Sequence, residues 1–260
     1  MRGGLKELCL RAGSIIVLLV LWWACAKLIN DPQVLPGPVA IGRTIVKNFG
    51  VPGPEGESAV FDVGITLARI FTAFAAAMVA GIGIGLAMGL NRPFERSLLT
   101  IIPLMLTMPT ILMVFLAVMW FGYSESGALV AVMAVVTPYV AVNMYEGTRA
   151  MDKSLIDMAI AFKASRLLRL RGVYLPQLLP YIFAAFRYAF GITWKIVALA
   201  ETFGLKFGIG YMFYFWFQQF NMTQVLAWII MFVVCMLLLE HLIFARLERR
   251  AFAWRSSRSA

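Results

Sequence analysis

The stretch Asp157-Met-Ala-Ile-Ala-Phe-Lys-Ala-Ser-Arg166 lies in a polar island, residues 147–173, of a chain that is otherwise almost wholly apolar. The island carries six Lys and Arg residues, and the dipeptide Leu175-Pro176 follows it. Apolar segments long enough to be membrane helices flank it on both sides. A cationic segment between two such helices lies outside the lipid, so the island is where the protein is expected to meet a partner or a surface.

The composition excludes an ordinary water-soluble domain. Hydrophobic residues make up 62% of the 260 residues and charged residues 14%, and the mean hydropathy is +0.84. A soluble domain could not keep so much apolar surface out of water. The net charge of +10 does not indicate nucleic-acid binding, because the cations lie between apolar spans. The chain is therefore predicted to be an all-α membrane protein.

Six segments have the apolar length of about 20 residues that crosses a bilayer. They are residues 14–30, 63–90, 98–121, 126–147, 176–204 and 222–245. Lys and Arg are concentrated in alternate connections: residues 1–13 carry three, 91–97 two, 147–173 six and 246–260 five. Cytoplasmic loops carry an excess of positive charge, so both termini and the island are predicted to be cytoplasmic.

This pattern divides the chain into four parts. We expect an N-terminal transmembrane helix in residues 1–31, an external loop with a short amphipathic helix in 32–62, a core in 63–245 and a basic cytoplasmic tail in 246–260. The first helix also has the form of a cleaved secretory signal that ends at Ala24-Cys-Ala26. Retention of the helix is preferred, because Trp22 and Trp23 are bulky beside that site.

Two spans have compositions that predict how they pack. Residues 63–90 are rich in Gly and Ala, which let helix backbones approach closely in a membrane. Residues 98–121 contain Pro103 and Pro109, which remove backbone hydrogen bonds. The first span is predicted to be an interior helix and the second a bent segment that lines a pathway.

A short helix is predicted within the island, at about residues 155–168. A break is predicted after it at Leu175-Pro176, where the chain turns back into the membrane. Ser154 and Asp157 have the spacing of a capping box, in which Ser154 accepts the amide of Asp157. The helix has more apolar residues than one membrane-facing stripe needs, and its cations prevent it from crossing the bilayer. From composition alone, it either docks into a groove of a partner or lies on anionic lipid.

The island resembles the cytoplasmic coupling loop of ABC importer permeases, whose pattern reads Glu-Ala-Ala, Gly, Ala-Ser and then Leu-Pro. Further segments resemble, in order, elements of the sulfonate, taurine and nitrate type of these permeases. They are Leu35-Pro-Gly-Pro38, Met119-Trp-Phe-Gly122, Ala200-Glu-Thr-Phe-Gly204, Gly208-Ile-Gly-Tyr211 and Leu247-Glu-Arg-Arg250 with Trp254. Two positions depart from the pattern: Asp157 stands where the family has glutamate, and Lys163 where it has glycine.

The resemblance implies a type I ABC importer permease with six transmembrane helices in the bacterial inner membrane. Its implied partners are a second permease subunit, two cytoplasmic ABC ATPases, an external substrate-binding protein and membrane lipid. The chain has no Gly-x4-Gly-Lys-Ser/Thr motif, so we expect a transport subunit with no cofactor of its own, and ATP and Mg on the ATPase. The implied ATPase-coupling residues are Asp157, Met158, Ala159, Ala161, Lys163, Ala164, Ser165, Arg166, Leu175 and Pro176.

Ionisable residues inside membrane spans are candidate functional sites. For Lys195 and Glu201, pore lining and helix packing both stay open, whereas for Arg69 and Arg187 packing or pairing between helices is preferred. The candidate substrate pathway consists of Met105, Met108, Tyr139, Asn143, Trp194, Lys195 and Glu201.

The cargo is predicted to be a small anion such as a sulfonate, taurine or nitrate, if Lys195 faces a pore shared by two copies. The aromatic and amide residues of the pathway suit instead a neutral or aromatic nutrient, such as a vitamin precursor. An ATP-independent carrier or channel is the alternative of another class.

Overall fold

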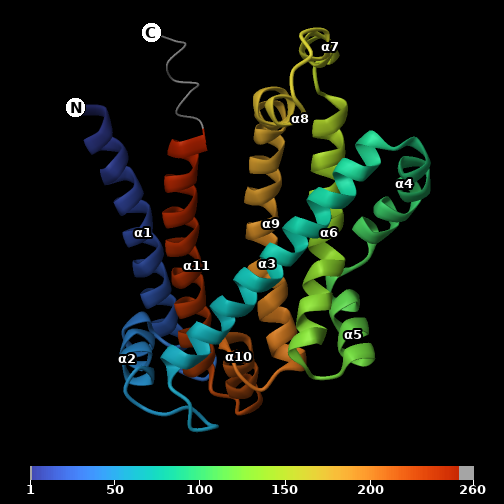
Figure 1. The fold of residues 1–260 in the computed structure, drawn as a ribbon. Coiled ribbons are helices and arrows are strands. Elements are labelled where there is room, and N and C mark those ends of the chain that lie inside the picture. Colours follow the sequence, from blue (N-terminus) through green and yellow to red (C-terminus); the bar gives the residue numbers. More distant parts are fainter. Residues whose placement is uncertain (1, 252–260) are drawn as a thin grey trace. The chain divides into compact units, whose positions relative to one another are not determined.

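The computed structural model describes residues 2–251, and it describes the side chains of residues 13–243. Over this range the chain consists of helices and connections and contains no strand, which confirms the predicted all-α class (Figure 1). The chain divides into two units. The first unit is Met1–Gly64 with Phe207–Cys235, and the second is Ile65–Lys206 with Met236–Ala260.

The first unit holds α1 (Arg2–Ile29), α2 (Pro38–Asn48), α10 (Ile209–Gln218), the start of α3 (Ala59–Leu90) and the first part of α11 (Met222–Ala251). Helix α2 is the predicted amphipathic helix. Proline is favoured at the first helical position, because it has no amide hydrogen to leave unpaired there, and α2 accordingly begins at Pro38. The side-chain amides of Asn48 and Gln224 pair through two hydrogen bonds of 2.9 and 3.1 Å, which join α2 to α11.

The second unit is organised around α6 (Glu125–Arg149). This helix packs against α5 (Thr110–Phe121), α4 (Arg92–Thr107) and α9 (Leu175–Gly204). Its valines at successive turns, Val132, Val136 and Val140, are fully buried. Burial of such a stripe is the main stabilising contribution available to a helix that is apolar over most of its length.

Close contact between α3 and α6 confirms the packing predicted from the small residues. Gly81, Gly85 and Gly89 lie on successive turns of α3 and face α6. A Cβ atom at Gly85 would lie 2.4 Å from the carbonyl oxygen of Ala141, and one at Gly89 would lie 2.4 Å from the Thr148 side chain. Only glycine permits the two helices to approach this closely.

Four helices among the described residues are long and apolar enough to cross a membrane: 59–90, 125–149, 166–204 and 222–243. The predicted span 98–121 consists of α4 and α5, which meet at an angle of 102°. The bend falls at Met108-Pro109, as the prolines predicted, while Pro103 is accommodated inside α4. The apolar helix at 13–29 is shorter than the other spans, so its crossing of the membrane stays a prediction.

The predicted basic tail, residues 246–260, lies outside the described side chains, and its residues 252–260 lie wholly outside the described residues. The motif at Leu247–Arg250 and Trp254 falls in the same part of the chain.

Candidate functional site

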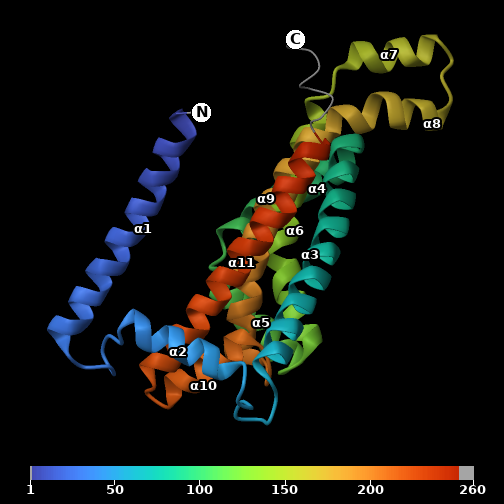
Figure 2. The same ribbon diagram turned by 90° about the vertical axis from the view of Figure 1, so that its left-hand side faces the viewer.

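The polar island forms a helical hairpin at one end of α6 and α9. Helix α7 (Lys153–Ala161) is followed by a turn, by α8 (Arg166–Arg169) and by one π-helical turn, Leu170–Tyr174, that leads into α9. In Figure 2, α7 and α8 lie side by side and both project sideways from the upper end of α9. The prediction of one continuous helix over 155–168 is therefore wrong.

The interruption is caused by the backbone at Lys163. This residue has φ of +51°, in the left-handed region. The Lys163 amide donates to the carbonyl of Ile160 at 2.9 Å, and the Ala164 amide donates to the carbonyl of Ala159 at 3.0 Å. These two bonds form the Schellman motif, which ends helices and favours glycine at its left-handed position. The position where the resemblance leads us to expect glycine is thus the position that has the glycine conformation, although a lysine occupies it.

Helix α7 also begins differently from the prediction. Its N-cap is Asp152, whose Oδ1 accepts the amide of Ser154 at 2.8 Å and the hydroxyl of Ser154 at 2.7 Å. The predicted capping box at Ser154 and Asp157 is wrong, because the Ser154 hydroxyl donates to Asp152 and the helix has already begun at Lys153. The Ser154 hydroxyl and then its amide lower the pKa of Asp152. Ser165 caps α8 by accepting the amide of Leu168 at 3.3 Å.

The predicted break at Leu175-Pro176 is absent, since residues 166–204 are helical without interruption. Pro176 has no amide hydrogen to donate to the preceding turn, and the helix widens just before it. The Leu175 amide donates to the carbonyl of Leu170, five residues back. In Figure 2 the chain changes direction in this region, between α8 and α9.

The hairpin exposes a large apolar surface, which we call the α7–α8 face. Its residues are Leu155, Met158, Ile160, Phe162, Leu167, Leu168 and Leu170, each at least 41% exposed. Phe162, at 80%, is the most exposed of them. Exposed cations, Lys153, Lys163, Arg166 and Arg171, accompany these side chains.

Most of the predicted coupling residues lie on the surface of the hairpin. The exposed ones are Asp157, Met158, Ala161, Lys163, Ser165, Arg166, Leu175 and Pro176. Ala164 is half-buried, and Ala159, a residue of α7 itself, is buried. A partner could therefore touch eight of the ten side chains directly, whereas Ala159 supports the hairpin from inside.

Glu201 lies in a network of charges that joins α3, α6 and α9. The Arg69 guanidinium lies 2.8 Å from the Glu201 carboxylate through Nη1 and 2.8 Å from Glu125 through Nε. The Thr66 hydroxyl donates to Glu201 at 2.9 Å. Glu201 is fully buried and Arg69 nearly so. Glu201 thus takes part in the packing of helices. It is also a partner of Arg69 in the pairing between helices that the sequence favoured.

The remaining pathway candidates are distributed around α6 and α9. The Tyr139 ring lies 4.9 Å from the Tyr188 ring, and the Asn143 amide donates to the Tyr139 carbonyl at 2.9 Å. The Lys195 ammonium lies 5.4 Å from the Trp194 ring. Met108 is exposed at the bend between α4 and α5, and Met105 is half-buried one turn earlier.

A cavity of about 550 Å³ opens on the surface of the second unit and includes Lys195. Its lining residues are Ala184, Arg187, Tyr188, Gly191, Ile192, Lys195 and Glu240. The sequence prediction missed Arg187 and Glu240 as members of this group. The helical spacing of residues 184–195 was available as a signal for Arg187, but nothing in the sequence pairs α9 with position 240.

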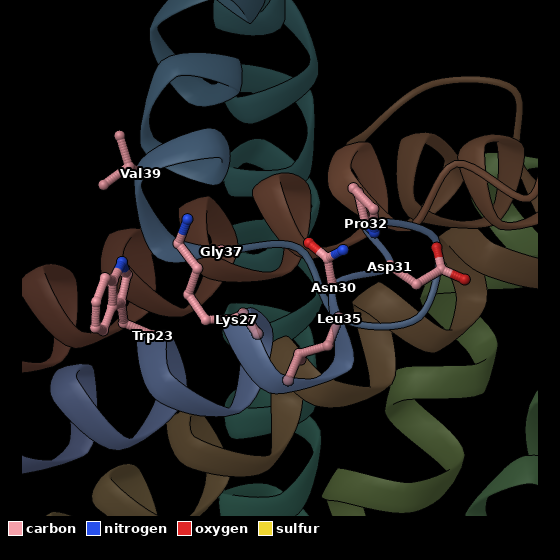
Figure 3. Close-up of a pocket in the computed structure, with 9 residues that line it drawn as sticks. Trp23, Lys27, Asn30, Asp31, Pro32, Leu35, Gly37 and Val39 are labelled. Carbon is pink, nitrogen blue, oxygen red and sulfur yellow. The ribbon is translucent and has the colours of Figure 1, made fainter.

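A second hollow, of about 320 Å³, lies where α1 joins α2 in the first unit. Figure 3 shows Trp23 and Lys27 on α1, with Asn30, Asp31 and Pro32 on the connection. The Asp31 carboxylate accepts the amide of Gln33 at 2.8 Å and so closes a local turn. In the described part of the chain, no group of three or more His, Cys, Asp or Glu residues could hold a metal ion.

Comparison with known proteins agrees with this architecture. Residues 77–252 match the model of the family described as "binding-protein-dependent transport system inner membrane component". The chain is 30% identical over 253 residues to the taurine transport system permease protein TauC of Escherichia coli, covering 96% of this chain and 90% of TauC. It is also 30% identical to the putative aliphatic sulfonates transport permease protein SsuC of Bacillus subtilis, covering 98% and 89%. A solved inward-facing structure of the methionine ABC transporter MetNI has a similar fold, with a TM-score of 0.63 and 19% identity over 74% of this chain and 95% of that chain.

Proposed function

The chain belongs to the binding-protein-dependent transport system inner membrane components, and from this premise we propose that it moves a small anion while its α7–α8 face sits on an ABC ATPase. The chain is a permease subunit of an ABC importer in the bacterial inner membrane, and ATP hydrolysis lies with a partner subunit. Family membership favours this role over an ATP-independent carrier or channel.

The observation that carries the docking proposal is the uncovered α7–α8 face. Phe162, Met158 and Ile160 are half or more exposed on a segment that also carries exposed cations. Such a segment cannot enter the hydrocarbon with its charges, and in water it leaves several large apolar side chains exposed, as protein interfaces do. A groove on an ATPase buries the apolar side chains and leaves the cations at its rim.

The assembly we propose has two copies of this permease or one copy with a similar subunit, two ATPases and an external binding protein. ATP and Mg bind to the ATPases. All six apolar segments cross the membrane, with both termini and the hairpin in the cytoplasm, because the Lys and Arg residues are concentrated in those connections. Membrane lipid surrounds the remaining apolar faces.

An anionic cargo is supported by two observations. The relatives TauC and SsuC are named for taurine and aliphatic sulfonates, and Arg187 and Lys195 both line the cavity on α9. A neutral or aromatic nutrient would gain little from two cations at membrane depth.

In the mechanism that we propose, ATP draws the ATPases together, the hairpins move with them, and the two permease subunits rock to open the pathway outward.

The docking proposal is tested with a matched pair of variants. Phe162→Glu places a charge at the most exposed apolar position of the hairpin, and Phe162→Leu keeps that position apolar. Each is expressed with an ABC ATPase that co-purifies with the native permease, and is purified in mild detergent. We expect Phe162→Glu to lose most of the co-purifying ATPase, and Phe162→Leu to retain it. Equal recovery with both variants would reject the α7–α8 face as the docking surface, and anionic vesicles would then test the lipid interpretation.

A further inference from the structure

We infer that the cavity on α9 is a binding site for the anionic group of the cargo, with Arg187 and Lys195 as the residues that select its charge. This inference deepens the proposed function and rests on it. Arg187 and Lys195 both belong to this site, although the sequence favoured only packing or pairing between helices for Arg187. Glu240 is the acidic residue of the same site.

The lining residues of α9 form one stripe. Positions 184, 187, 188, 191, 192 and 195 recur at alternating steps of three and one, which keeps them on the same side of a helix with 3.6 residues per turn. Arg187, Tyr188 and Lys195 are exposed along this stripe. The stripe is therefore open on its outer side in the single chain.

The two cations lie at the depth of the hydrocarbon. Helix α9 covers 30 residues, Leu175–Gly204, and its midpoint falls between Arg187 and Lys195. The rise of about 1.5 Å per residue separates them by about 12 Å along the axis, well inside a hydrocarbon layer of about 30 Å. Cations at this depth face water or protein rather than lipid, because exposure to lipid is costly.

The charges of the cavity fit an anion better than the other possible occupants. A lipid headgroup lies at the membrane surface, and the stripe is centred near the middle of the bilayer. A second copy packed directly on the stripe would bring Arg187 and Lys195 close to the same cations of its partner, which disfavours a dry contact. The volume of about 550 Å³ is within the range of small-molecule sites.

The side chains of the cavity supply complementary contacts. The planar guanidinium of Arg187 matches the paired oxygens of a sulfonate or carboxylate, and the ammonium of Lys195 adds a point charge. Among the described side chains, Lys195 and Glu240 form no salt bridge, although both line the cavity. Glu240 competes with the cargo for the cations, so it lowers anion affinity and favours release.

The test measures charge selection directly, in the assembled transporter with its ATPase and binding protein. A cysteine is placed by Gly191→Cys in a background with the native cysteines changed to serine. Gly191 lines the cavity, and a Cβ atom there meets nothing within 4 Å. The probes are two thiosulfonate reagents that modify the cysteine thiol, one with an anionic sulfonate group and one with a cationic trimethylammonium group. The modification rate of each reagent is divided by its rate with a small free thiol, which corrects for its intrinsic reactivity. The charge ratio is the corrected rate of the anionic reagent divided by that of the cationic reagent.

We expect the anionic reagent to react about tenfold faster than the cationic one. Arg187→Gln and Lys195→Gln each bring the ratio of the anionic to the cationic rate toward one, and Glu240→Gln raises this ratio. Arg92→Gln, which removes an exposed cation outside the cavity, leaves the ratio unchanged. A ratio at or below one with the native cations, or a ratio that changes equally with Arg92→Gln, would overturn the inference.

The outcome separates this inference from the proposed function. ATP hydrolysis stimulated by the loaded binding protein is measured on the same preparations, and Arg92→Gln should retain it. Arg187→Gln should raise several-fold the taurine concentration that half-maximal transport requires, whereas Arg92→Gln should leave this concentration unchanged. Loss of stimulation with the native cations in place would contradict the proposed function itself. Normal stimulation with no charge preference at Gly191→Cys would contradict only the anion site.

Discussion

The Nη1 atom of Arg69 lies 2.8 Å from Oε1 of Glu201, and both side chains are buried. This ion pair joins α3 to α9 at sites 132 residues apart in the sequence. Glu125, whose side chain is 63% exposed, takes the other side of the guanidinium. The permease core therefore contains a charged network that joins three helices, and its buried carboxylate, Glu201, accepts hydrogen bonds from Arg69 and Thr66.

Removal of Arg69 alone should destabilise the protein strongly. Arg69→Leu leaves the Glu201 carboxylate buried without its cation, a change that typically costs about 3–5 kcal/mol. Replacing both residues, as Arg69→Leu with Glu201→Leu, should recover most of that loss, because no buried charge remains. The free energy of unfolding in mixed micelles is measured for Arg69→Leu, for the double variant and for the native protein. A single variant as stable as the native protein would contradict the buried pair.

The contact between α3 and α6 predicts opposite effects at two glycines of one helix. Gly85→Ala places a Cβ atom 2.4 Å from the Ala141 carbonyl oxygen, and we expect the overpacking to cost about 1–3 kcal/mol. Gly83→Ala meets open space and should gain up to about 1 kcal/mol from helix propensity. Unfolding in mixed micelles compares the pair, and equal effects at the two positions would argue against this helix contact.

The sequence predicts the apolar helices, the bend at Pro109 and the tight packing of α3 well, because each depends on local composition or on one residue type. The hairpin was predicted only in outline. A capping box, a continuous helix and a break at Pro176 all follow from local rules, yet Asp152 captures Ser154, Lys163 adopts a left-handed conformation, and a π-turn carries the chain past Pro176.

The partners of buried charges could not be predicted from the sequence. In the sequence, the cation nearest to Glu201 on the same helix is Lys195, six residues away, whereas the structure pairs Glu201 with Arg69 and Thr66 on another helix. Helical spacing constrains only pairs within one helix. The same limit applies to Glu240, which joins Arg187 and Lys195 in a cavity through the tertiary packing of the second unit.

Lys163→Gly should stabilise the hairpin. An L-residue in the left-handed helical region costs about 1–2 kcal/mol relative to glycine, and the greater freedom of glycine in the unfolded chain offsets part of this. We expect a net gain of up to about 1 kcal/mol, which corresponds to about fivefold slower hydrogen exchange at the Ala164 amide. Lys163→Val should accelerate exchange at that amide. Faster exchange in the glycine variant would contradict the assigned conformation.

The cap of α7 predicts a pH dependence. The Ser154 hydroxyl and amide lower the pKa of Asp152, so its contribution to the stability of α7 is fully present above the ordinary Asp pKa. It is lost as the pH falls through the lowered value. The Ser154 amide chemical shift, followed by NMR through the acid range, reports this transition. Asp152→Asn retains the cap without a titrating group and should abolish the transition; a transition that persists would assign it to another carboxylate.

Contact between the α7–α8 face and the ATPase can be tested by photo-crosslinking in membranes. A photo-crosslinking amino acid is placed at position 162 on the exposed tip of the hairpin, and a matched one replaces Phe220, which is 85% exposed in the connection between α10 and α11. In membranes that contain the full transporter, we expect an ATPase adduct from position 162 and none from position 220. Adducts with lipid alone at position 162, in a transporter that still hydrolyses ATP in response to its binding protein, would rule out docking of the α7–α8 face on the ATPase.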